Sequence, residues 1–349
     1  MTGWADKKST LAVVIPAYNA AATLSDCLAA LRRSNRVPDE LILFDDGSSD
    51  DTPRIARAAG AVVIRDGPPR QGPAVGRNIG AATATSSTIV FVDADVAIHP
   101  DALGRLEAPL LAGEAVASFG SYDDRPKSRR AAALYANLRH HWVHQNGREE
   151  AFTFWSGLGA MRRDTFLAHK GFDPRFREPS IEDVDLGIRI IEGGGKICLV
   201  KDALGTHHKD WGVAQLWKTD ISRRAVPWAL LMKEGRGRAD DLNISTKERA
   251  SAVVAHLLWL TALAAILRPS WWPAPVAMAA LYLALNVRFI LFLGRAAGIR
   301  AAVTGTILHS CYHLYASVTF ALVSAGFVPL RRRKKIITAT AGRTQATRP

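Results

Sequence analysis

The stretch "IVFVDADV", residues 89–96, joins an apolar strand to two carboxylates that stand one residue apart. Aspartate is disfavoured in strands, so Asp93 and Asp95 need a special reason at this position. Residues two apart in a strand face the same side, and both side chains are therefore expected to point to one place. Like charges so close repel each other unless a positive group lies between them. The pattern predicts a divalent cation at the end of this strand.

Around this stretch, apolar strands alternate with helices. Strands are expected at 11–15, 40–44, 61–64 and 89–92, and helices at 23–33, after Thr52-Pro53 and at 73–84. Near-continuous apolar strands joined by helices predict an α/β fold with a mostly parallel sheet between helices. Ligands of such sheets bind beyond the carboxyl ends of the strands. Three strands end there in polar pairs, which are Tyr18-Asn19, Asp45-Asp46 and Asp93-Asp95.

The net positive charge of the chain is concentrated in its last third. Of the 45 basic and 32 acidic residues, 32 basic and 30 acidic ones lie in 1–240, which leaves 13 and 2 in 241–349. These late basic residues flank apolar segments and fill a tail, which favours an anionic membrane surface as the partner over nucleic acid. The three cysteines, Cys27, Cys198 and Cys311, form no C-x-x-C pair, which is typical of a reducing compartment.

Three apolar segments predict a membrane region. Val253–Leu267 and Val276–Leu293 are near the lower limit of about 17–25 residues for a span, and Ala301–Val328 is more polar. With no apolar core before the first strand, no signal peptide is expected, so the α/β domain should be cytoplasmic. The positive-inside rule then predicts two full spans in the inner cell membrane, a third segment that lies in the interface or re-enters, and a cytoplasmic C-terminus.

The predicted domains are therefore the α/β domain at 1–240, a membrane-associated helical region at 241–330 and a basic, disordered tail at 331–349.

Five motifs occur in a fixed order: "VVIPAYNA", "ILFDDGSSDDT", "GRNIGAA", "FVDADV" and "GFDPRFREPSIEDVDLGIRI". As an ordered set over residues 10–215 they resemble a family 2 glycosyltransferase of the GT-A fold, here followed by C-terminal membrane helices. The resemblance implies an inverting enzyme that uses a nucleotide-diphosphate sugar. It also implies donor contacts from Pro16, Tyr18, Asn19, Asp45, Asp46, Arg77, Asn78 and Asp93. A tyrosine ring can stack on a nucleobase and arginine suits phosphate, although a plain turn and a surface arginine are the alternatives.

In the family, the D-x-D motif holds a divalent ion, and it maps onto Asp93 and Asp95. Carboxylate oxygens suit Mg²⁺ or Mn²⁺, which bridges the diphosphate of the donor. His207 matches a position where some members place a metal-ligating histidine, but His208 is a second candidate and a structural histidine is equally compatible. By spacing alone, His140, His141 and His144 could bind zinc, with no fourth ligand in view.

The E-D pair of the family supplies the catalytic base and maps onto Glu182-Asp183, with Asp183 as the base. Helix capping is the alternative for carboxylates at a helix start. The segment "FWSGLGAMRRDTF" resembles the acceptor side, which implies acceptor contacts from Trp155 and Gly157, while a core tryptophan is the alternative.

The expected function is transfer of a sugar, with inversion, to an acceptor hydroxyl or phosphate of a lipid-linked or glycan acceptor. Processive synthases carry Q-x-x-R-W, and "SRRAVPW" (222–228) lacks the glutamine, so a single transfer is expected. A nucleotidyltransferase acting on sugar phosphates would show a Gly-rich phosphate loop near the N-terminus, which "VVIPAYNAAATL" lacks. A non-catalytic membrane scaffold is disfavoured because the D-x-D and E-D pairs are intact.

Overall fold

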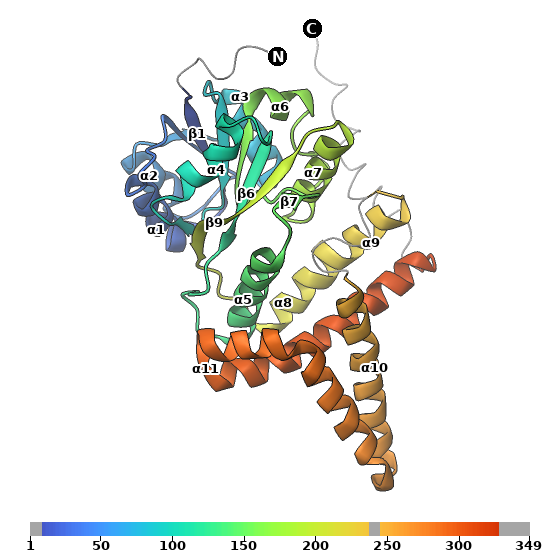
Figure 1. The fold of residues 1–349 in the computed structure, drawn as a ribbon. Helices are drawn as coiled ribbons and strands as arrows, with labels where there is room; N and C mark the ends of the chain where they lie inside the picture. Colours follow the sequence, from blue (N-terminus) through green and yellow to red (C-terminus); the bar gives the residue numbers. More distant parts are fainter. Residues whose placement is uncertain (1–8, 237–244, 328–349) are drawn as a thin grey trace. The chain divides into compact units, whose positions relative to one another are not determined.

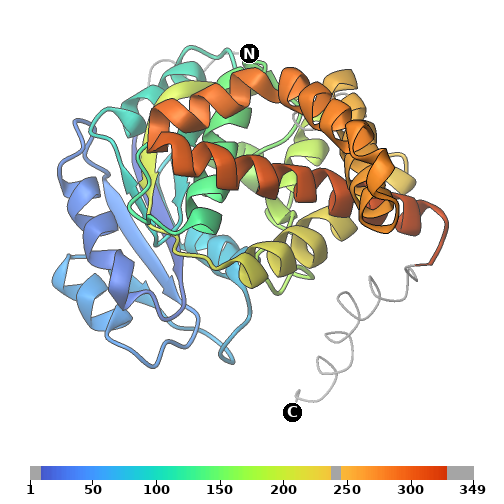
Figure 2. The same ribbon diagram turned by 90° about the horizontal axis from the view of Figure 1, so that it is seen from below.

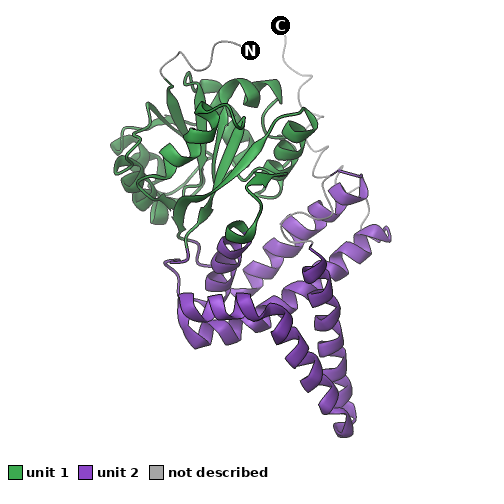
Figure 3. Ribbon diagram, in the orientation of Figure 1, with its two compact units in different colours: residues 1–123, 144–208, 329–349 green, residues 124–143, 209–328 purple. Residues whose placement is uncertain are grey.

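The computed structural model describes residues 9–236 and 245–327, and the chain divides into two compact units (Figure 3). Within the described residues, unit 1 comprises 9–123 and 144–208, and unit 2 comprises 124–143, 209–236 and 245–327. The predicted boundary between residues 240 and 241 and the predicted tail at 331–349 lie outside the described residues, so the predicted domain division stays a prediction.

In the described part of unit 1, nine strands form one mixed sheet (Figure 1). The strand order is β3-β2-β1-β4-β8-β6-β9-β5, and β7 pairs with β9. Strands β3, β2, β1 and β4 are parallel to one another, while β8 runs antiparallel to both β4 and β6. The bounds are β1 Leu11–Ala17, β2 Glu40–Asp45, β3 Val62–Ile64, β4 Thr88–Val92, β5 Val96–Ile98, β6 Ala117–Tyr122, β7 Glu150–Ala151, β8 Leu158–Arg162 and β9 Ile197–His207.

Helices cover both faces of the sheet because successive strand residues bury opposite sides. In β1, Leu11, Val13 and Ile15 pack in one core with α1, α2 and α4, whereas Ala12 and Val14 pack in a second core with α3, α6 and α7. The bounds are α1 Ala21–Arg32, α2 Thr52–Ala58, α3 Pro73–Thr83, α4 Ala102–Leu111, α5 Ala131–Asn146, α6 Arg163–Ala168 and α7 Glu182–Glu192; α5 begins in unit 2 and ends in unit 1.

The predicted strand and helix alternation of the first hundred residues is confirmed, and each bound that was predicted lies within two residues of the observed one. The predicted α/β fold of the GT-A type is confirmed as well. Because β1, β2 and β4 are parallel, their carboxyl ends lie at one edge of the sheet, where the three polar pairs come together.

Unit 2 is helical. Its elements are most of α5, α8 Val213–Thr219, a π-helical segment Asp220–Ala225, α9 Val226–Lys233, α10 Thr246–Leu267, a 3₁₀ turn Pro269–Trp271 and α11 Pro273–Ser324. Helix α11 is kinked at Gly298, whose φ is 85°, into a first arm (273–297) and a second arm (299–324). The arms lie side by side (Figure 2), and a Cβ at Gly305 would come within 2.6 Å of Leu293 Cδ1. Glycine at 305 therefore permits the close packing of the arms.

Two helical stretches of unit 2, Thr246–Leu267 and Pro269–Ser324, are long and apolar enough to cross a membrane. Most of their side chains are not buried inside the protein. The predicted spans 253–267 and 276–293 lie in α10 and in the first arm of α11, respectively. The third predicted segment, 301–328, lies in the second arm and the residues that follow it, and the structure describes it as far as residue 327.

Candidate active site

The carboxylates that end β2 hold the loops of the site in place. Asp45 is buried, and its Oδ1 accepts a hydrogen bond from the Ser48 amide at 3.0 Å while Oδ2 accepts from Arg65. Asp46 accepts from two successive amides, Gln71 N at 2.7 Å and Gly72 N at 2.8 Å. Asp45 therefore fixes the turn after β2, and Asp46 fixes the loop between β3 and α3. The predicted role of both residues in donor binding stays a prediction.

Gly72 occupies a position that only glycine fits. Its φ is +96°, and a Cβ there would lie 2.2 Å from the carbonyl oxygen of Arg177. A side chain would therefore need both a rare backbone conformation and movement of the backbone of the 177 loop. This close approach brings the start of α3 against the loop that leads into α7.

The turn after β1 carries the first polar pair. The Tyr18 ring is 43% exposed, with the Arg70 guanidinium 5.2 Å from its centre. Asn19 takes a positive φ of 49°, and its Oδ1 accepts from the Ser49 amide at 2.9 Å. Pro16 lies in β1 beside Phe44 of β2. Tyr18 is therefore exposed enough to meet a ligand at this edge of the sheet.

Arg77 of α3 joins two of the predicted motifs. The guanidinium is buried, and it donates to Asp93 Oδ1 at 2.7 Å and to Glu182 Oε1 at 3.0 Å. Burial alone would lower the pKa of this arginine, but the charges of Asp93 and Glu182 raise it above its ordinary value. Asn78 instead exchanges two hydrogen bonds with the backbone of Phe172, at 2.7 and 2.9 Å. Arg77 therefore links the D-x-D motif to the E-D pair.

Asp95 faces His207 rather than Arg77. His207 Nε2 lies 3.2 Å from Asp95 Oδ2, and the His208 amide donates to the Asp95 carbonyl oxygen at 2.8 Å. The buried His207 ring stacks on Tyr122, with ring centres 4.1 Å apart. The His208 ring turns away, with its Nδ1 3.3 Å from Asp26 Oδ2. Of the doublet, His207 is thus the histidine placed against the D-x-D motif.

The two aspartates of the D-x-D motif bind different partners, which differs from the common direction expected of a strand. The reason is that β4 ends at Val92, so the alternation of a strand no longer applies at Asp93 and Asp95. Neither predicted ligand set is assembled within residues 9–236 and 245–327. The ligand atoms of Asp93, Asp95 and His207 do not all lie within 4.8 Å of one another, and the same is true of His140, His141 and His144.

The chemistry of Asp95 and His207 nevertheless fits Mg²⁺ or Mn²⁺. A carboxylate and an imidazole with their ligand atoms 3.2 Å apart would supply two of the six positions of an octahedral shell, and phosphate oxygens of a donor are a natural complement. The Asp93 and Asp95 side chains are 32% and 31% exposed, so an ion that arrives with a substrate can reach them.

Asp183 lies at the first turn of α7, next to Glu182. Its Oδ2 accepts from the Ser156 amide at 3.1 Å and from the Ser156 hydroxyl at 3.3 Å, and its Oδ1 accepts from the Val184 amide at 2.8 Å. Burial and the neighbouring charge of Glu182 raise the pKa of Asp183 to about 7, against the lowering effects of these hydrogen bonds and of Arg77. The carboxylate can therefore change its protonation state near neutral pH.

The segment before β8 connects these groups. The Asp93 amide donates to the Gly157 carbonyl oxygen at 3.1 Å, and a Cβ at Gly157 would lie 2.5 Å from the Trp155 ring. Trp155 is partly buried and meets Tyr122 edge to face, at 4.7 Å between ring centres. Three residues that sequence reasoning did not select therefore support the site, namely Tyr122, Ser156 and Arg65. Of these three, only Ser156 could have been selected from the sequence, because it stands between the predicted acceptor residues Trp155 and Gly157.

Residues 12–168 match the sequence model of glycosyl transferase family 2. These residues form a glycosyltransferase family 2 domain. Glucosyl-3-phosphoglycerate synthase of Mycobacterium tuberculosis is 35% identical over 127 residues, which are 34% of this chain and 39% of that protein. The succinoglycan biosynthesis protein ExoU of Rhizobium meliloti is 35% identical over 98 residues, 27% of this chain and 28% of that protein. The chain thus spans about two fifths of the length of the mycobacterial relative.

Solved structures also match about two thirds of the chain. A mycobacterial protein is 26% identical, with a TM-score of 0.49, over 67% of this chain and 78% of that one. A structure of the M. tuberculosis synthase in complex with Mn²⁺, UDP and glucosyl-3-phosphoglycerate is 25% identical, with a TM-score of 0.48, over 67% of this chain and 83% of that one.

Proposed function

We propose that the chain is a metal-dependent, inverting glycosyltransferase that moves a sugar from a nucleotide-diphosphate sugar to an acceptor hydroxyl or phosphate. The observation that carries the proposal is the geometry of Asp183. This carboxylate has a pKa near 7, is held by Ser156, and adjoins a chain of ion pairs from Glu182 through Arg77 to the D-x-D residue Asp93. The match of residues 12–168 to glycosyl transferase family 2 supports the same reading.

Asp183 is the proposed base. Inversion needs a group opposite the leaving diphosphate that takes the proton of the acceptor hydroxyl as the new glycosidic bond forms. A pKa near the working pH balances the fraction of ionised carboxylate against its basicity. Burial is the main cause of this high pKa, and the negative charge of Glu182 adds to it by disfavouring ionisation of its neighbour. Glu182 thereby acts on Asp183 through charge and on Arg77 through an ion pair.

The donor is proposed to lie across the carboxyl ends of β1, β2 and β4. There the exposed ring of Tyr18 would stack on the base, and Asn19, Asp45 and Asp46 would shape the turns around it. Asp93, Asp95 and His207 would hold Mg²⁺ or Mn²⁺, which neutralises the charge that develops on the leaving diphosphate. The Arg77 guanidinium holds Asp93 in place at 2.7 Å, and the Tyr122 ring orients His207.

The acceptor is proposed to be lipid-linked and the enzyme to act at the cytoplasmic face of a membrane. Two stretches long and apolar enough to span a membrane follow the catalytic residues, and the excess of basic residues lies in the same part of the chain. Basic residues beside apolar segments favour the anionic cytoplasmic leaflet. Trp155 and Gly157 are the proposed acceptor contacts, since they lie next to Ser156, which holds the base.

Incubation of the full chain, purified in detergent, with a panel of nucleotide-diphosphate sugars and Mn²⁺ tests this function. The expected product is free nucleoside diphosphate, formed faster when membrane lipids are added, together with a glycosylated lipid in the mass spectrum. A nucleotidyltransferase would instead release pyrophosphate from a nucleoside triphosphate and a sugar phosphate. A scaffold would turn over neither, and either outcome would overturn the proposal.

A further inference from the structure

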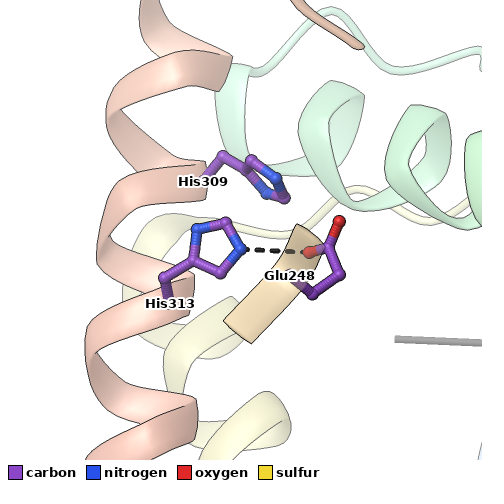
Figure 4. A group of neighbouring side chains, drawn as sticks. All are labelled: Glu248, His309 and His313. Carbon is purple, nitrogen blue, oxygen red and sulfur yellow. Dashed lines mark hydrogen bonds and ion pairs between the residues drawn. The ribbon is translucent and has the colours of Figure 1, made fainter. Parts of the chain in front are cut away.

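Unit 2 contains a group of three side chains with metal-ligand chemistry that is separate from the family 2 site. Glu248 of α10 and His309 and His313 of α11 each offer one ligand atom, and the three atoms lie within 4.8 Å of one another. Figure 4 shows the carboxylate and the two rings turned toward one another. Within residues 9–236 and 245–327 no other group meets the same distance criterion.

The sequence places the two histidines on one helix face. His309 and His313 stand four residues apart in the second arm of α11, and their ring centres are 4.5 Å apart. Residues at i and i+4 are neighbours on a helix surface, which is the spacing with which two histidines of one helix bind a single zinc ion. Glu248 reaches them from the first turn of α10, with its Oε2 3.0 Å from His313 Nε2.

Each histidine has a tyrosine partner at its Nδ1 nitrogen, which leaves Nε2 as the proposed ligand atom. The Tyr135 hydroxyl of α5 lies 3.0 Å from His309 Nδ1, and the Tyr282 hydroxyl of the first arm lies 3.0 Å from His313 Nδ1. Ligating histidines are typically oriented in this way by a hydrogen bond at the nitrogen that does not bind the metal. A phenol can donate or accept, so the tyrosines remain satisfied when the Nε2 lone pairs turn to an ion.

Burial and charge are also those of a metal site. His309 and His313 are only 6% and 3% exposed, and ionisable groups in apolar helices are costly unless they are paired or bind a metal. Arg139 donates to the Tyr135 hydroxyl at 3.4 Å, but this arginine is paired with the buried Asp220 at 3.1 Å. The carboxylate of Glu248 thus supplies a negative charge to balance part of the charge of a divalent ion.

We propose that Glu248, His309 and His313 bind Zn²⁺ or a similar divalent transition ion, independently of the proposed glycosyl transfer. Two imidazoles and one carboxylate are a zinc ligand set that leaves a fourth position for water or another ligand. Ligands of a tetrahedral zinc ion stand about 3.3 Å apart, given metal–ligand distances of about 2.0–2.1 Å. The distance of 3.0 Å between His313 Nε2 and Glu248 Oε2 is close to this value. All three ligand atoms lie within 4.8 Å of one another, so side-chain movements of at most about 1.5 Å would complete the site. The ion would tie α10 to α11.

The test uses the full chain without a polyhistidine tag, purified in detergent and stripped of metal. An Asp95→Asn background and the absence of nucleotide remove binding at the donor site. Titration with Zn²⁺ is followed by calorimetry, and titration with Co²⁺ by visible absorption. We expect one ion per chain, with Co²⁺ bands typical of tetrahedral nitrogen and oxygen ligands, and a rise in Tm that depends on ion concentration.

Variants assign the ion to these residues. His309→Gln with His313→Gln should abolish binding, and Tyr282→Phe should weaken it about 10- to 100-fold by removing the partner of a ligand. His256→Gln is the matched control, because His256 lies in α10, as Glu248 does, but bonds the carbonyl oxygen of Ala252 in its own helix. Equal binding by the double variant, or no ion bound by the folded parent chain, would overturn the proposal. If the double variant does not fold, the Co²⁺ spectrum of the parent and the Tyr282→Phe affinity decide.

Discussion

Replacing Asp183 by asparagine tests the central step of the proposed reaction. Asparagine keeps the size of the side chain but cannot take a proton from the acceptor. The rate should fall by about 10²- to 10⁴-fold, the usual contribution of a general base, while the affinity for the donor stays within about twofold. Single-turnover kinetics with a saturating donor measure the first quantity, and calorimetric titration with the nucleoside diphosphate and Mn²⁺ measures the second.

The pH dependence gives a magnitude that follows from the structure. The ionised carboxylate is the active form, and the pKa of Asp183 is raised from 3.8 to about 7. About a tenth of the molecules therefore carry the active form at pH 6 and about nine tenths at pH 8, so kcat/KM should rise about tenfold between them. An aspartate at its ordinary pKa would be fully ionised over this range and would give no rise.

Glu182→Gln is the matched perturbation. The charge of Glu182 raises the pKa of Asp183, and Arg77 lowers it, so removal of the glutamate charge should move the acid limb of the profile to lower pH. The limb should be absent from the residual activity of Asp183→Asn. A flat wild-type profile from pH 6 to pH 8, or the same limb in Asp183→Asn, refutes the assignment of the base.

Three further predictions concern the metal, the fold and the topology. Asp95→Ala should nearly abolish turnover and EDTA should silence the wild type until Mn²⁺ is restored, whereas full activity after exhaustive chelation argues against the proposed donor site. Gly72→Ala should destabilise unit 1 by about 1–3 kcal/mol in denaturant unfolding, because the residue has a φ of +96° and its new Cβ would meet the Arg177 carbonyl. Gly113→Ala is the control, because Gly113 also has a positive φ but a Cβ there would meet no atom within 4 Å. A reporter fused to the C-terminus should be labelled only after cells are permeabilised, and labelling of intact cells means three spans.

The first half of the fold was predictable because its rules are local. Apolar strands buried on both faces, Pro53 and Pro73 at helix starts, and polar residues at the strand ends are all signals within short stretches of sequence. These signals predicted the alternation of strands and helices, the edge of the sheet that carries the site, and the motifs that lie at that edge. The second half of the sheet was not resolved into elements, because β8 and β9 pair with strands distant in the chain, and short strands of mixed direction carry weak periodicity.

The partners of the site residues were harder to predict than the residues themselves. The D-x-D spacing indicated a shared target, but the strand ends at Val92, and Asp93 and Asp95 then meet Arg77 and His207. The choice of His207 over His208 depends on the Tyr122 ring, which belongs to a strand 85 positions earlier in the chain. Such contacts are determined by tertiary packing and cannot be predicted from composition or local spacing.

The two proposed metal sites differ in a way that their burial explains. Asp93 and Asp95 have about a third of their side-chain surface exposed and are engaged by an arginine and a histidine, which is appropriate for an ion that arrives and leaves with each donor. His309 and His313 are almost fully buried and are oriented by two tyrosines from other helical segments, which is appropriate for an ion that stays. Polar groups are expensive in apolar helices, and a permanently bound ion would offset that cost while fixing how α10 meets α11. If both proposals hold, the chain would use two kinds of ion, one that binds and leaves with each donor and one that stays between α10 and α11.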